Sequence, residues 1–374
     1  MAGIYLHIPF CKKACHYCDF HFSTLHENME EMVEAICREI VLRKNYLSDE
    51  KIESIYFGGG TPSLLNETQL LNLIGVVHEN FDVVANAEIT LEANPDDLSK
   101  ENLFIFKTSG INRLSIGIQS FHQQDLILIN RAHNVEQALM CVKDAKAAGF
   151  ENISIDLIYG LPNMSDDDWR RNLEIAFSLE VDHFSCYSLT VEPKTALAKM
   201  IQQHKVSDID DAQSARHFEV LMDQTAIHNY EHYEISNFAR HKKYSRHNTS
   251  YWQRKKYLGV GPSAHSYDGD TRQWNVYNNS IYMRALKNSE IPFEREELSE
   301  KDKLNEYLLT TLRTMWGMNL DFVKNNFGND AAVELEKKLS LLINEQLVEV
   351  QANNFILTRK GKYFADKVSL QLFV

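Results

Sequence analysis

Residues 4–20 read IYLHIPFCKKACHYCDF, an apolar run that is followed directly by three cysteines in the spacing C-x3-C-x2-C. The apolar run over residues 4–8 predicts a short β-strand. Residues 29–41 then place apolar side chains at helical spacing, so a helix follows. The chain therefore begins with a strand, a cysteine-rich loop and a helix. The cysteines of the loop are Cys11, Cys15 and Cys18.

The alternation of strands and helices continues up to about residue 190. Further runs typical of strands cover residues 54–57, 88–93, 113–118, 152–158 and 183–189. Candidate helices lie near residues 67–79, 98–108, 122–130, 134–148 and 166–178. Six strands that alternate with helices predict an α/β fold with a parallel sheet and right-handed crossovers, either open or closed into a barrel. No GxGxxG follows the first strand, so the fingerprint of a dinucleotide-binding fold is missing.

The pattern changes after about residue 235. Residues 236–290 are rich in aromatic side chains and are expected to be irregular. The elements expected after them are an amphipathic helix at 304–315, a helix near 329–344, the strand LVEVQ, a turn at Asn353 and Asn354, the strand FIL, and a helix capped by Thr358. This order resembles a small winged-helix-like unit. We therefore expect three domains with the boundaries 1–235, 236–290 and 291–374.

Composition and charge exclude several classes of protein. The chain has 39 Lys and Arg against 52 Asp and Glu, a net charge of −13, which argues against a surface that grips nucleic acid. Residues 301–374 hold 10 Lys and Arg against 9 Asp and Glu, so the winged-helix-like unit has no basic excess for DNA. No apolar run approaches the roughly 20 residues that span a bilayer, and the N-terminus lacks the pattern of a secretory signal. We expect a cytoplasmic protein that binds no nucleic acid and has no transmembrane segment.

The cysteine loop is the strongest chemical signal. Three thiolates from one loop leave one iron of a 4Fe–4S cluster without a protein ligand, because most such clusters use four. An open iron can bind the amino and carboxylate groups of S-adenosylmethionine (SAM), and one electron then cleaves a carbon–sulfur bond to give a 5′-deoxyadenosyl radical. A zinc site with His16 or His21 as fourth ligand is the alternative, although a distant second ligand pair is missing. The other cysteines are expected to be buried apolar residues: Cys37, Cys141 and Cys186.

Polar residues follow the ends of other predicted strands. Residues 58–62 (GGGTP) follow the second strand, where glycines either let a ligand approach the backbone or simply form a turn. Glu92, Gln119 and Asp156 lie in or directly after later strands, and Arg131 can pair with a carboxylate. Since ligand sites gather at the carboxyl ends of parallel strands, we expect these residues to meet the cysteine loop there.

These motifs resemble those of the radical SAM superfamily, whose signature C-x3-C-x-[aromatic]-C is met with Tyr17 at the aromatic position. More narrowly, the chain resembles the oxygen-independent coproporphyrinogen III oxidase-like family. The motifs that carry this resemblance are YLHIPFCKKACHYCDF, YFGGGTPSLL, LEANPDD, RLSIGIQSF, INRAH, SIDLIYGLP, YEISNFA, HNTSYW and LGVGPSAHS. The resemblance implies a partial (β/α)6 radical SAM barrel with one 4Fe–4S cluster on the three cysteines. It also implies that SAM contacts Tyr5, Tyr17, Gly59, Gly60, Thr61, Glu92, Gln119, Arg131 and Asp156.

Two departures separate the chain from the oxidases of that family. The oxidases carry a further cysteine two residues after the third, where this chain has Phe20, and an N-terminal extension, whereas this chain begins a few residues before its first strand. Both differences favour the branch regarded as haem chaperones, which bind haem and pass it to haem-requiring proteins such as respiratory enzymes. That branch carries the motif HNxxYW, which this chain has at residues 247–252. The resemblance implies a haem site built from His247, Asn248, Tyr251 and Trp252.

The residues of this motif suit haem chemically. A neutral imidazole such as that of His247 is a good axial ligand of haem iron, and the rings of Tyr251 and Trp252 can stack on the macrocycle. From Arg240 to Lys256 there are seven Lys and Arg and no Asp or Glu, so the segment can pair with propionates. The simpler alternative is a solvated basic loop above packed aromatic rings.

We therefore predict a haem chaperone that holds a 4Fe–4S cluster, SAM and haem as cargo. Its expected partners are haem-requiring clients, reached by peripheral contact where these are membrane-bound, and an electron donor such as a flavodoxin or ferredoxin. One alternative is an oxygen-independent coproporphyrinogen III oxidase that forms protoporphyrinogen by oxidative decarboxylation. Another is a radical SAM enzyme that acts on RNA, for which the acidic charge is unfavourable. The SAM-cleaving residues are all present, so turnover of SAM is compatible with the chaperone as well as with the enzymes.

Overall fold

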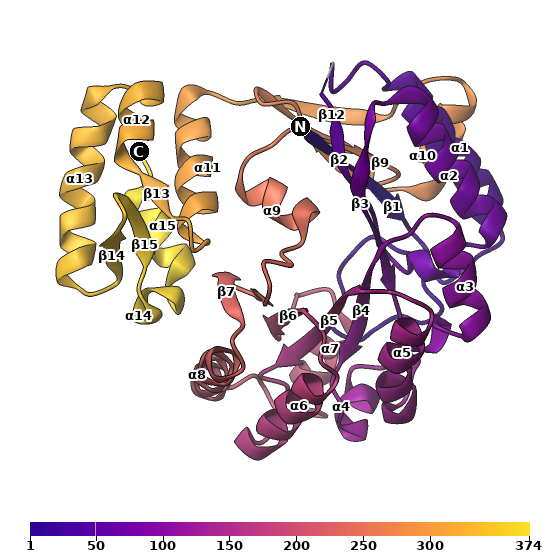
Figure 1. Ribbon diagram of the computed structural model, residues 1–374, viewed down its shortest axis with the longest axis horizontal. Coiled ribbons are helices and arrows are strands. Elements are labelled where there is room, and N and C mark those ends of the chain that lie inside the picture. Colours follow the sequence, from indigo (N-terminus) through magenta and orange to yellow (C-terminus); the bar gives the residue numbers. More distant parts are fainter. Residues whose placement is uncertain (49) are drawn as a thin grey trace.

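The computed structural model describes residues 1–48 and 50–374, which form two hydrophobic cores. The larger core contains buried residues between Ala2 and Leu286, and the smaller one contains residues between Leu304 and Leu372. Figure 1 shows the first part as a curved sheet flanked by helices and the second part as a small, mainly helical domain beside it. Within the described residues, no helix is both long and apolar enough to cross a membrane.

Six neighbouring parallel strands form the centre of a twelve-stranded sheet with the order β12-β11-β10-β9-β1-β2-β3-β4-β5-β6-β8-β7. These six strands are β1 (Ala2–Ile8), β2 (Ile52–Gly59), β3 (Val83–Ala93), β4 (Arg113–Gln119), β5 (Asn152–Tyr159) and β6 (His183–Ser188). Each is parallel to its neighbour in this series. The predicted α/β fold with six parallel strands is therefore confirmed, because runs of apolar residues mark strands that are buried on both faces.

The helices between these strands lie close to their expected positions. They are α1 (Met29–Leu42), α2 (Glu67–Asn80), α3 (Lys100–Thr108), α4 (Gln123–Leu128), α5 (Val135–Ala147) and α6 (Asp166–Ser178). Asn66, Asn134 and Ser165 form capping boxes at the starts of α2, α5 and α6, which satisfy backbone N–H groups that a helix start leaves open. The sequence pattern does not predict α7 (Ala196–Gln202) or α8 (Asp211–Ile227). The buried face of α8 includes the polar His217 and Thr225, which weakens its apolar period.

The chain after β6 extends the sheet at both ends, so the expectation that residues 236–290 are irregular is wrong. At one end, β8 (Asn237–Ala239) pairs antiparallel with β6, and β7 (Glu231–Glu234) pairs with β8. At the other end, β9 (Tyr257–Val260) is parallel to β1 and is followed by antiparallel β10 (His265–Tyr267), β11 (Thr271–Asn275) and β12 (Phe293–Glu297). Two helices, α9 (Arg246–Trp252) and α10 (Asn279–Lys287), belong to the same stretch of chain. Such short strands show no clear period in the sequence. The division into three domains stays a prediction.

The smaller core belongs to a C-terminal domain with the order of elements that defines a winged helix, as predicted. Its elements are α11 (Glu300–Leu312), β13 (Met318–Asn319), α12 (Leu320–Phe327), α13 (Asn329–Asn344), β14 (Val348–Gln351), β15 (Asn354–Leu357), α14 (Arg359–Lys362) and α15 (Ala365–Leu372). The three strands form one sheet in the order β13-β15-β14. Thr358 caps α14 as expected, because its hydroxyl accepts the backbone N–H of Gly361 at 3.0 Å.

A buried carboxylate fastens α1 to the part of the sheet that the late strands build. Glu39 is fully buried and forms an ion pair of 2.8 Å with Arg43. It also accepts hydrogen bonds from the backbone N–H of Gly261 at 2.9 Å, from the Asn275 side chain at 2.8 Å and from the Tyr282 hydroxyl at 2.5 Å. A buried charge that is paired and fully hydrogen-bonded holds its neighbours in one arrangement, and removing it leaves a buried partner uncompensated.

Replacing Glu39 should therefore destabilise the whole larger core. We expect Glu39→Ala to lower the free energy of unfolding by about 3–5 kcal/mol, because Arg43 would keep a buried charge without its partner. Urea titrations followed by circular dichroism measure this difference. Glu34→Ala is the matched control on the same helix, since Glu34 is exposed and its ion pair with Arg38 should contribute less than about 0.5 kcal/mol. Equal effects of the two substitutions would contradict the role of Glu39.

Candidate functional site

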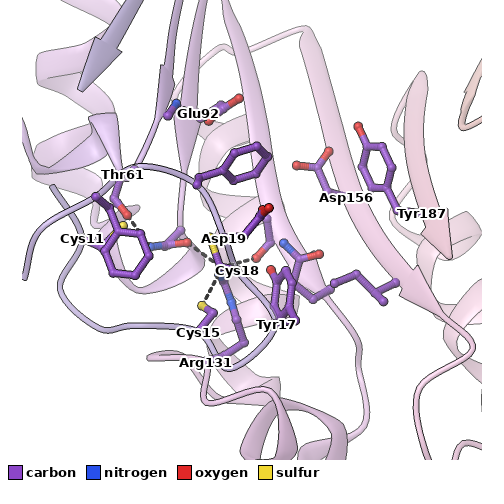
Figure 2. Close-up of a pocket in the computed structure, with 18 of the residues that line it drawn as sticks. Cys11, Cys15, Tyr17, Cys18, Asp19, Thr61, Glu92, Arg131, Asp156 and Tyr187 are labelled. Atoms are coloured by element: carbon purple, nitrogen blue, oxygen red, sulfur yellow. Dashed lines mark hydrogen bonds between the residues drawn. The ribbon is translucent and has the colours of Figure 1, made fainter. Parts of the chain in front are cut away.

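A cavity of about 470 Å³ lies at the carboxyl ends of the parallel strands. Figure 2 shows Cys11, Cys15 and Cys18 on one side of it and the side chains of Asp156 and Tyr187 on the other. Residues from the cysteine loop and from the ends of β2, β3, β4, β5 and β6 contribute to its walls. The expectation that the strand-end residues meet the cysteine loop is met, since parallel strands present their carboxyl ends at one edge of the sheet.

The cysteine loop is fastened to the chain that follows α4. The backbone N–H of His16 donates to the Ile129 carbonyl at 3.0 Å, and Nδ1 of the same histidine lies 2.8 Å from the Leu128 carbonyl. The side-chain amide of Asn130 donates to the Ala14 carbonyl at 2.7 Å. The stretch INRAH therefore positions the cysteine loop. This structural role of the motif is not evident from its sequence.

The three loop cysteines line the cavity and form no disulfide. Burial raises the pKa of Cys18 to about 12, and burial also raises the pKa of Cys11 although Thr61 opposes the shift. Arg131 donates through Nη1 to the Cys15 sulfur at 3.4 Å. Thiols in such surroundings lose their protons when metal ions bind, because the metal supplies the compensating positive charge.

The geometry does not fit the alternative of a zinc site. Among residues 1–48 and 50–374, no three His, Cys, Asp or Glu side chains converge on a single metal ion. His16 is held by the Leu128 carbonyl, and His21 lines a different cavity. Three sulfur atoms that do not meet at one point suit an iron–sulfur cluster, in which each thiolate binds its own iron. Cys141 and Cys186 are buried as expected, whereas Cys37 is only partly buried and packs against the core.

The glycines after β2 let the chain pass close to the start of the cysteine loop. The N–H of Gly60 donates to the Ile8 carbonyl at 2.9 Å, and a Cβ atom on Gly60 would lie 2.5 Å from the Phe10 carbonyl oxygen, which is too close. Gly59 has a φ of 106°, in the left-handed region that favours glycine. The fold itself therefore requires both glycines, and both still line the cavity together with Thr61.

Two carboxylates lie deep in the cavity. The Tyr56 hydroxyl donates to Glu92 at 2.9 Å, and the backbone N–H of Gly59 donates to it at 3.2 Å. The Ser115 hydroxyl donates to Asp156 at 3.3 Å. Burial raises the pKa of Glu92 to about 7 and that of Asp156 to about 6. Desolvation disfavours the charged carboxylates of Glu92 and Asp156. A ligand with an ammonium group or several hydroxyl groups would therefore stabilise these carboxylates.

Arg131 has one donor that is not used within the protein. Its Nη2 donates to the Gly117 carbonyl at 2.7 Å and to the Asn94 side chain, whereas its buried Nε has no partner among the described residues. An unpaired buried N–H is costly, so this atom suits the carboxylate of an amino acid ligand. Nearby Gln119 has a φ of 70°, a strained conformation for a residue with a side chain and one that gathers at functional sites.

The structure brings nearly all of the residues predicted to contact SAM into this cavity: Tyr17, Gly59, Gly60, Thr61, Glu92, Gln119, Arg131 and Asp156. Tyr5 is the exception, since it lines the neighbouring cavity and its hydroxyl lies 3.1 Å from Nδ1 of His7. Asn94 and Tyr187 also line the cavity and were not predicted. Both lie at or directly after strand ends, so the rule that selected Glu92 would have selected them as well.

A second cavity of about 620 Å³ lies beside the first. Asp19 and Phe20, which follow the last loop cysteine, line both cavities and so separate them. The other walls of the second cavity come from β1, α9, β9, β10, β11 and α11. The walls carry several aromatic rings, three cationic side chains and three histidines, namely Tyr5, Tyr251, Trp252, Tyr257, Tyr267, Arg254, Lys255, Arg272, His7, His21 and His265.

Only the second half of the HNxxYW stretch reaches this cavity. Tyr251 and Trp252 line it, whereas His247 and Asn248 do not. His247 is buried, with Nδ1 at 2.8 Å from the Ser54 hydroxyl and Nε2 at 2.7 Å from the Tyr251 hydroxyl. Burial lowers its pKa to about 3, so the ring is neutral. Ligation of haem iron by His247 would require one of these bonds to break, and it stays a prediction.

Two family models match the parts of the chain that hold the cavities and the C-terminal domain. The model of the radical SAM superfamily matches residues 5–176. The model of the HemN C-terminal domain matches residues 298–364. Among solved structures, the coproporphyrinogen III oxidase HemN of Escherichia coli, described as a radical SAM enzyme, covers 100% of this chain, and this chain covers 90% of it. Its TM-score of 0.86 at 24% identity shows that the two proteins share their fold.

Curated relatives match along the full length. Heme chaperone HemW of Bacillus subtilis is 33% identical over 98% of both chains. Heme chaperone HemW of Mycobacterium tuberculosis (strain ATCC 25618 / H37Rv) is 33% identical over 98% of this chain and 93% of its own. The mitochondrial Radical S-adenosyl methionine domain-containing protein 1 of Danio rerio is 36% identical over 71% of this chain and 60% of its own.

The fold and the three-cysteine cavity, with these matches, define a radical SAM protein, a class whose members combine a 4Fe–4S cluster with SAM. The residues of the cavity fit that pair of cofactors, because three cysteines of one loop line it and the buried Nε of Arg131 has no hydrogen-bond partner among the described residues. Within this class, the chain belongs to the HemW family.

The raised pKa of Glu92 should make the stability of the ligand-free protein depend on pH. The folded protein keeps the Glu92 proton up to about pH 7, whereas the unfolded chain releases it near pH 4.5. The free energy of unfolding should therefore fall by about 3 kcal/mol from this group as the pH rises through that window. Glu92→Gln should remove this part of the slope in urea titrations between about pH 5 and pH 8.

The exposed Glu79 provides the control for that measurement. Glu79→Gln should leave the pH dependence unchanged, because its carboxylate remains in solvent in both states. Asp156→Asn should remove a smaller contribution at lower pH, since its pKa is raised only to about 6. A pH profile of Glu92→Gln that coincides with that of the unchanged protein would contradict the burial of a protonated Glu92.

Proposed function

We propose that the protein is a haem chaperone that holds a 4Fe–4S cluster and SAM in the first cavity and carries haem in the second. The observation that carries this proposal is the second cavity, an aromatic space with imidazoles and cations directly beside the cysteine cavity. Porphyrins present flat apolar faces and anionic propionates, and these walls suit both. The relatives named heme chaperones, which match along 98% of the chain, support the same function.

In the first cavity, Cys11, Cys15 and Cys18 would hold a 4Fe–4S cluster through three of its irons, which would leave the fourth iron open to SAM. When bound, the cluster and SAM supply one-electron chemistry that cleaves a carbon–sulfur bond. The protein orients SAM: Arg131 donates to its carboxylate and Asn94 steadies Arg131. The wall is completed by the remaining residues that were predicted to contact SAM: Tyr17, Gly59, Gly60, Thr61, Glu92, Gln119 and Asp156.

In the second cavity, the rings of Tyr251 and Trp252 would pack against the porphyrin. Arg254 and Arg272, which already donate to the Lys303 carbonyl at 3.0 Å and to Glu306 at 2.6 Å, would face its propionates with their remaining N–H groups. We further propose haem-requiring respiratory proteins as the clients that receive the haem. A small electron-transfer protein such as a flavodoxin or ferredoxin supplies electrons to the cluster.

The cluster assignment predicts the effect of removing one loop cysteine. Cys15→Ala should abolish the iron and sulfide content of the anaerobically reconstituted protein, because two thiolates hold a 4Fe–4S cluster poorly. Metal and sulfide analysis and the visible absorption of the cluster measure this loss. Cys37→Ser is the matched control, since Cys37 lies on α1, away from the loop. Zinc in place of iron, or a cluster spectrum that ignores added SAM, would contradict the assignment.

A haem chaperone and a coproporphyrinogen III oxidase differ in what they release. The reconstituted protein should bind about one haem per chain and pass it to an apo-haem protein, and it should form no protoporphyrinogen from coproporphyrinogen III. Phe20, between the two cavities, stands where the similar oxidases carry a further cysteine. Absorption spectra of haem before and after transfer, with product analysis in parallel, test both statements. Carbon dioxide and protoporphyrinogen at enzymatic rates would overturn the chaperone function.

A further inference from the structure

The second cavity brings three histidines around one space, and they differ in how their ring nitrogens are used. His7 is buried, with Nε2 at 2.9 Å from the His21 carbonyl and Nδ1 at 3.1 Å from the Tyr5 hydroxyl. Burial lowers the pKa of His7 to about 4, and the ring of His21 lies 6.1 Å from the His7 ring, measured between centroids. His7 therefore has no free ring nitrogen with which to bind a metal.

His21 is partly committed to the protein. Its Nε2 lies 2.6 Å from the side-chain oxygen of Asn279, and its ring packs against Tyr277 at 4.2 Å between centroids. Only Nδ1 then remains to bind a metal. This nitrogen lies next to the point where the ring joins the side chain, so a macrocycle bound there would approach the backbone closely. His21 thus resembles a wall of the cavity more than a ligand.

His265 is free to bind iron. It is exposed, it lines the cavity, and its ring makes no hydrogen bond with any of the described residues. Burial of part of the ring and the nearby Arg272 lower its pKa, which favours the neutral imidazole that coordinates metals. The side chain projects from β10, whose antiparallel pairing with β11 sets His265 opposite Trp274 and Tyr267 opposite Arg272. A ring, a cation and an imidazole therefore stand together on one face of a rigid hairpin.

We propose that His265 is the axial ligand of the haem iron, with the porphyrin in the second cavity and Arg272 beside a propionate. This assignment rests on the proposed function, because it supplies the ligand that the haem chaperone needs. It also gives His247 a different role: its bond to the Tyr251 hydroxyl fixes the ring that forms the cavity wall. His247 is then a positioning residue, and Asp19 and Phe20 separate the bound haem from the cysteine cavity.

The test is a titration of the full-length protein with ferric haem, read by the Soret band and by the electron paramagnetic resonance of the iron. His265→Ala should weaken haem binding about tenfold or more and change the spin state of the iron. Added imidazole should restore the original spectrum by replacing the missing ligand. His241→Ala, an exposed histidine of the loop before α9, is the matched control and should leave the spectrum unchanged. Thermal unfolding of His265→Ala should match the unchanged protein, because the exposed ring holds no hydrogen bond.

The outcomes separate this inference from the function on which it rests. If the unchanged protein binds no haem, the chaperone function fails together with the ligand assignment. If it binds haem and His265→Ala leaves the spectrum intact, only the assignment of His265 fails. The assignment of His265 would also be overturned if His21→Ala or His247→Ala changed the iron ligand while unfolding normally, and His265→Ala did not change it. His247→Ala is expected to weaken binding while preserving the ligand spectrum, since only the position of Tyr251 changes.

Discussion

The parallel pairing of β1 with β2 on one side and with β9 on the other is the constraint on which both cavities depend. Tyr5 of β1 lies in register with Tyr56 of β2 and with Gly259 of β9. The cysteine loop leaves the end of β1 and therefore stands between two sets of strand ends. A Cβ atom on Gly259 would lie 2.0 Å from the His265 carbonyl oxygen, so this glycine is what lets β10 fold back over β9. One strand thus joins the cysteine cavity to the aromatic cavity.

Several groups of the first cavity are buried at an electrostatic cost that bound ligands would reduce. The thiols of Cys11 and Cys18 and the two carboxylates have raised pKa values because burial disfavours their charged forms, and the buried Nε of Arg131 has no hydrogen-bond partner among the described residues. Iron ions and the ammonium and carboxylate groups of SAM would offset these costs, so the arrangement favours the loaded protein. INRAH and GGGTP hold the cysteine loop beside these groups: Ile129 and Asn130 form hydrogen bonds with the loop, and Gly60 lets the chain pass close to its start.

The second cavity is assembled from parts of the chain that are far apart in sequence. Glu88 of β3 accepts the backbone N–H of Arg246 at 2.9 Å, which fastens the start of α9 to the parallel strands, and α9 also packs against α11. Arg272 of β11 donates to Glu306 of α11 at 2.6 Å. Figure 1 shows α11 next to α9. The C-terminal domain therefore closes one side of the cavity, because Glu306 and Thr310 of α11 line it. Its winged-helix-like order serves this packing, and its nearly balanced charge is consistent with that role.

The six parallel strands, the cysteine loop and most of the first cavity can be predicted from the amino-acid sequence. Apolar runs and residues at strand ends report local geometry, and parallel strands convert that local information into one site. Long-range contacts in the folded protein, in contrast, set the late strands, the place of Tyr5 in the other cavity, and the burial of His247 behind Tyr251. Local sequence carries no signal for these features. Short strands show no clear hydrophobic period, and the sequence does not indicate whether the ring nitrogens of a histidine are free or hydrogen-bonded. Whether the ring nitrogens of His247 can bind a metal depends on neighbours such as Ser54, which lies 193 residues away along the chain.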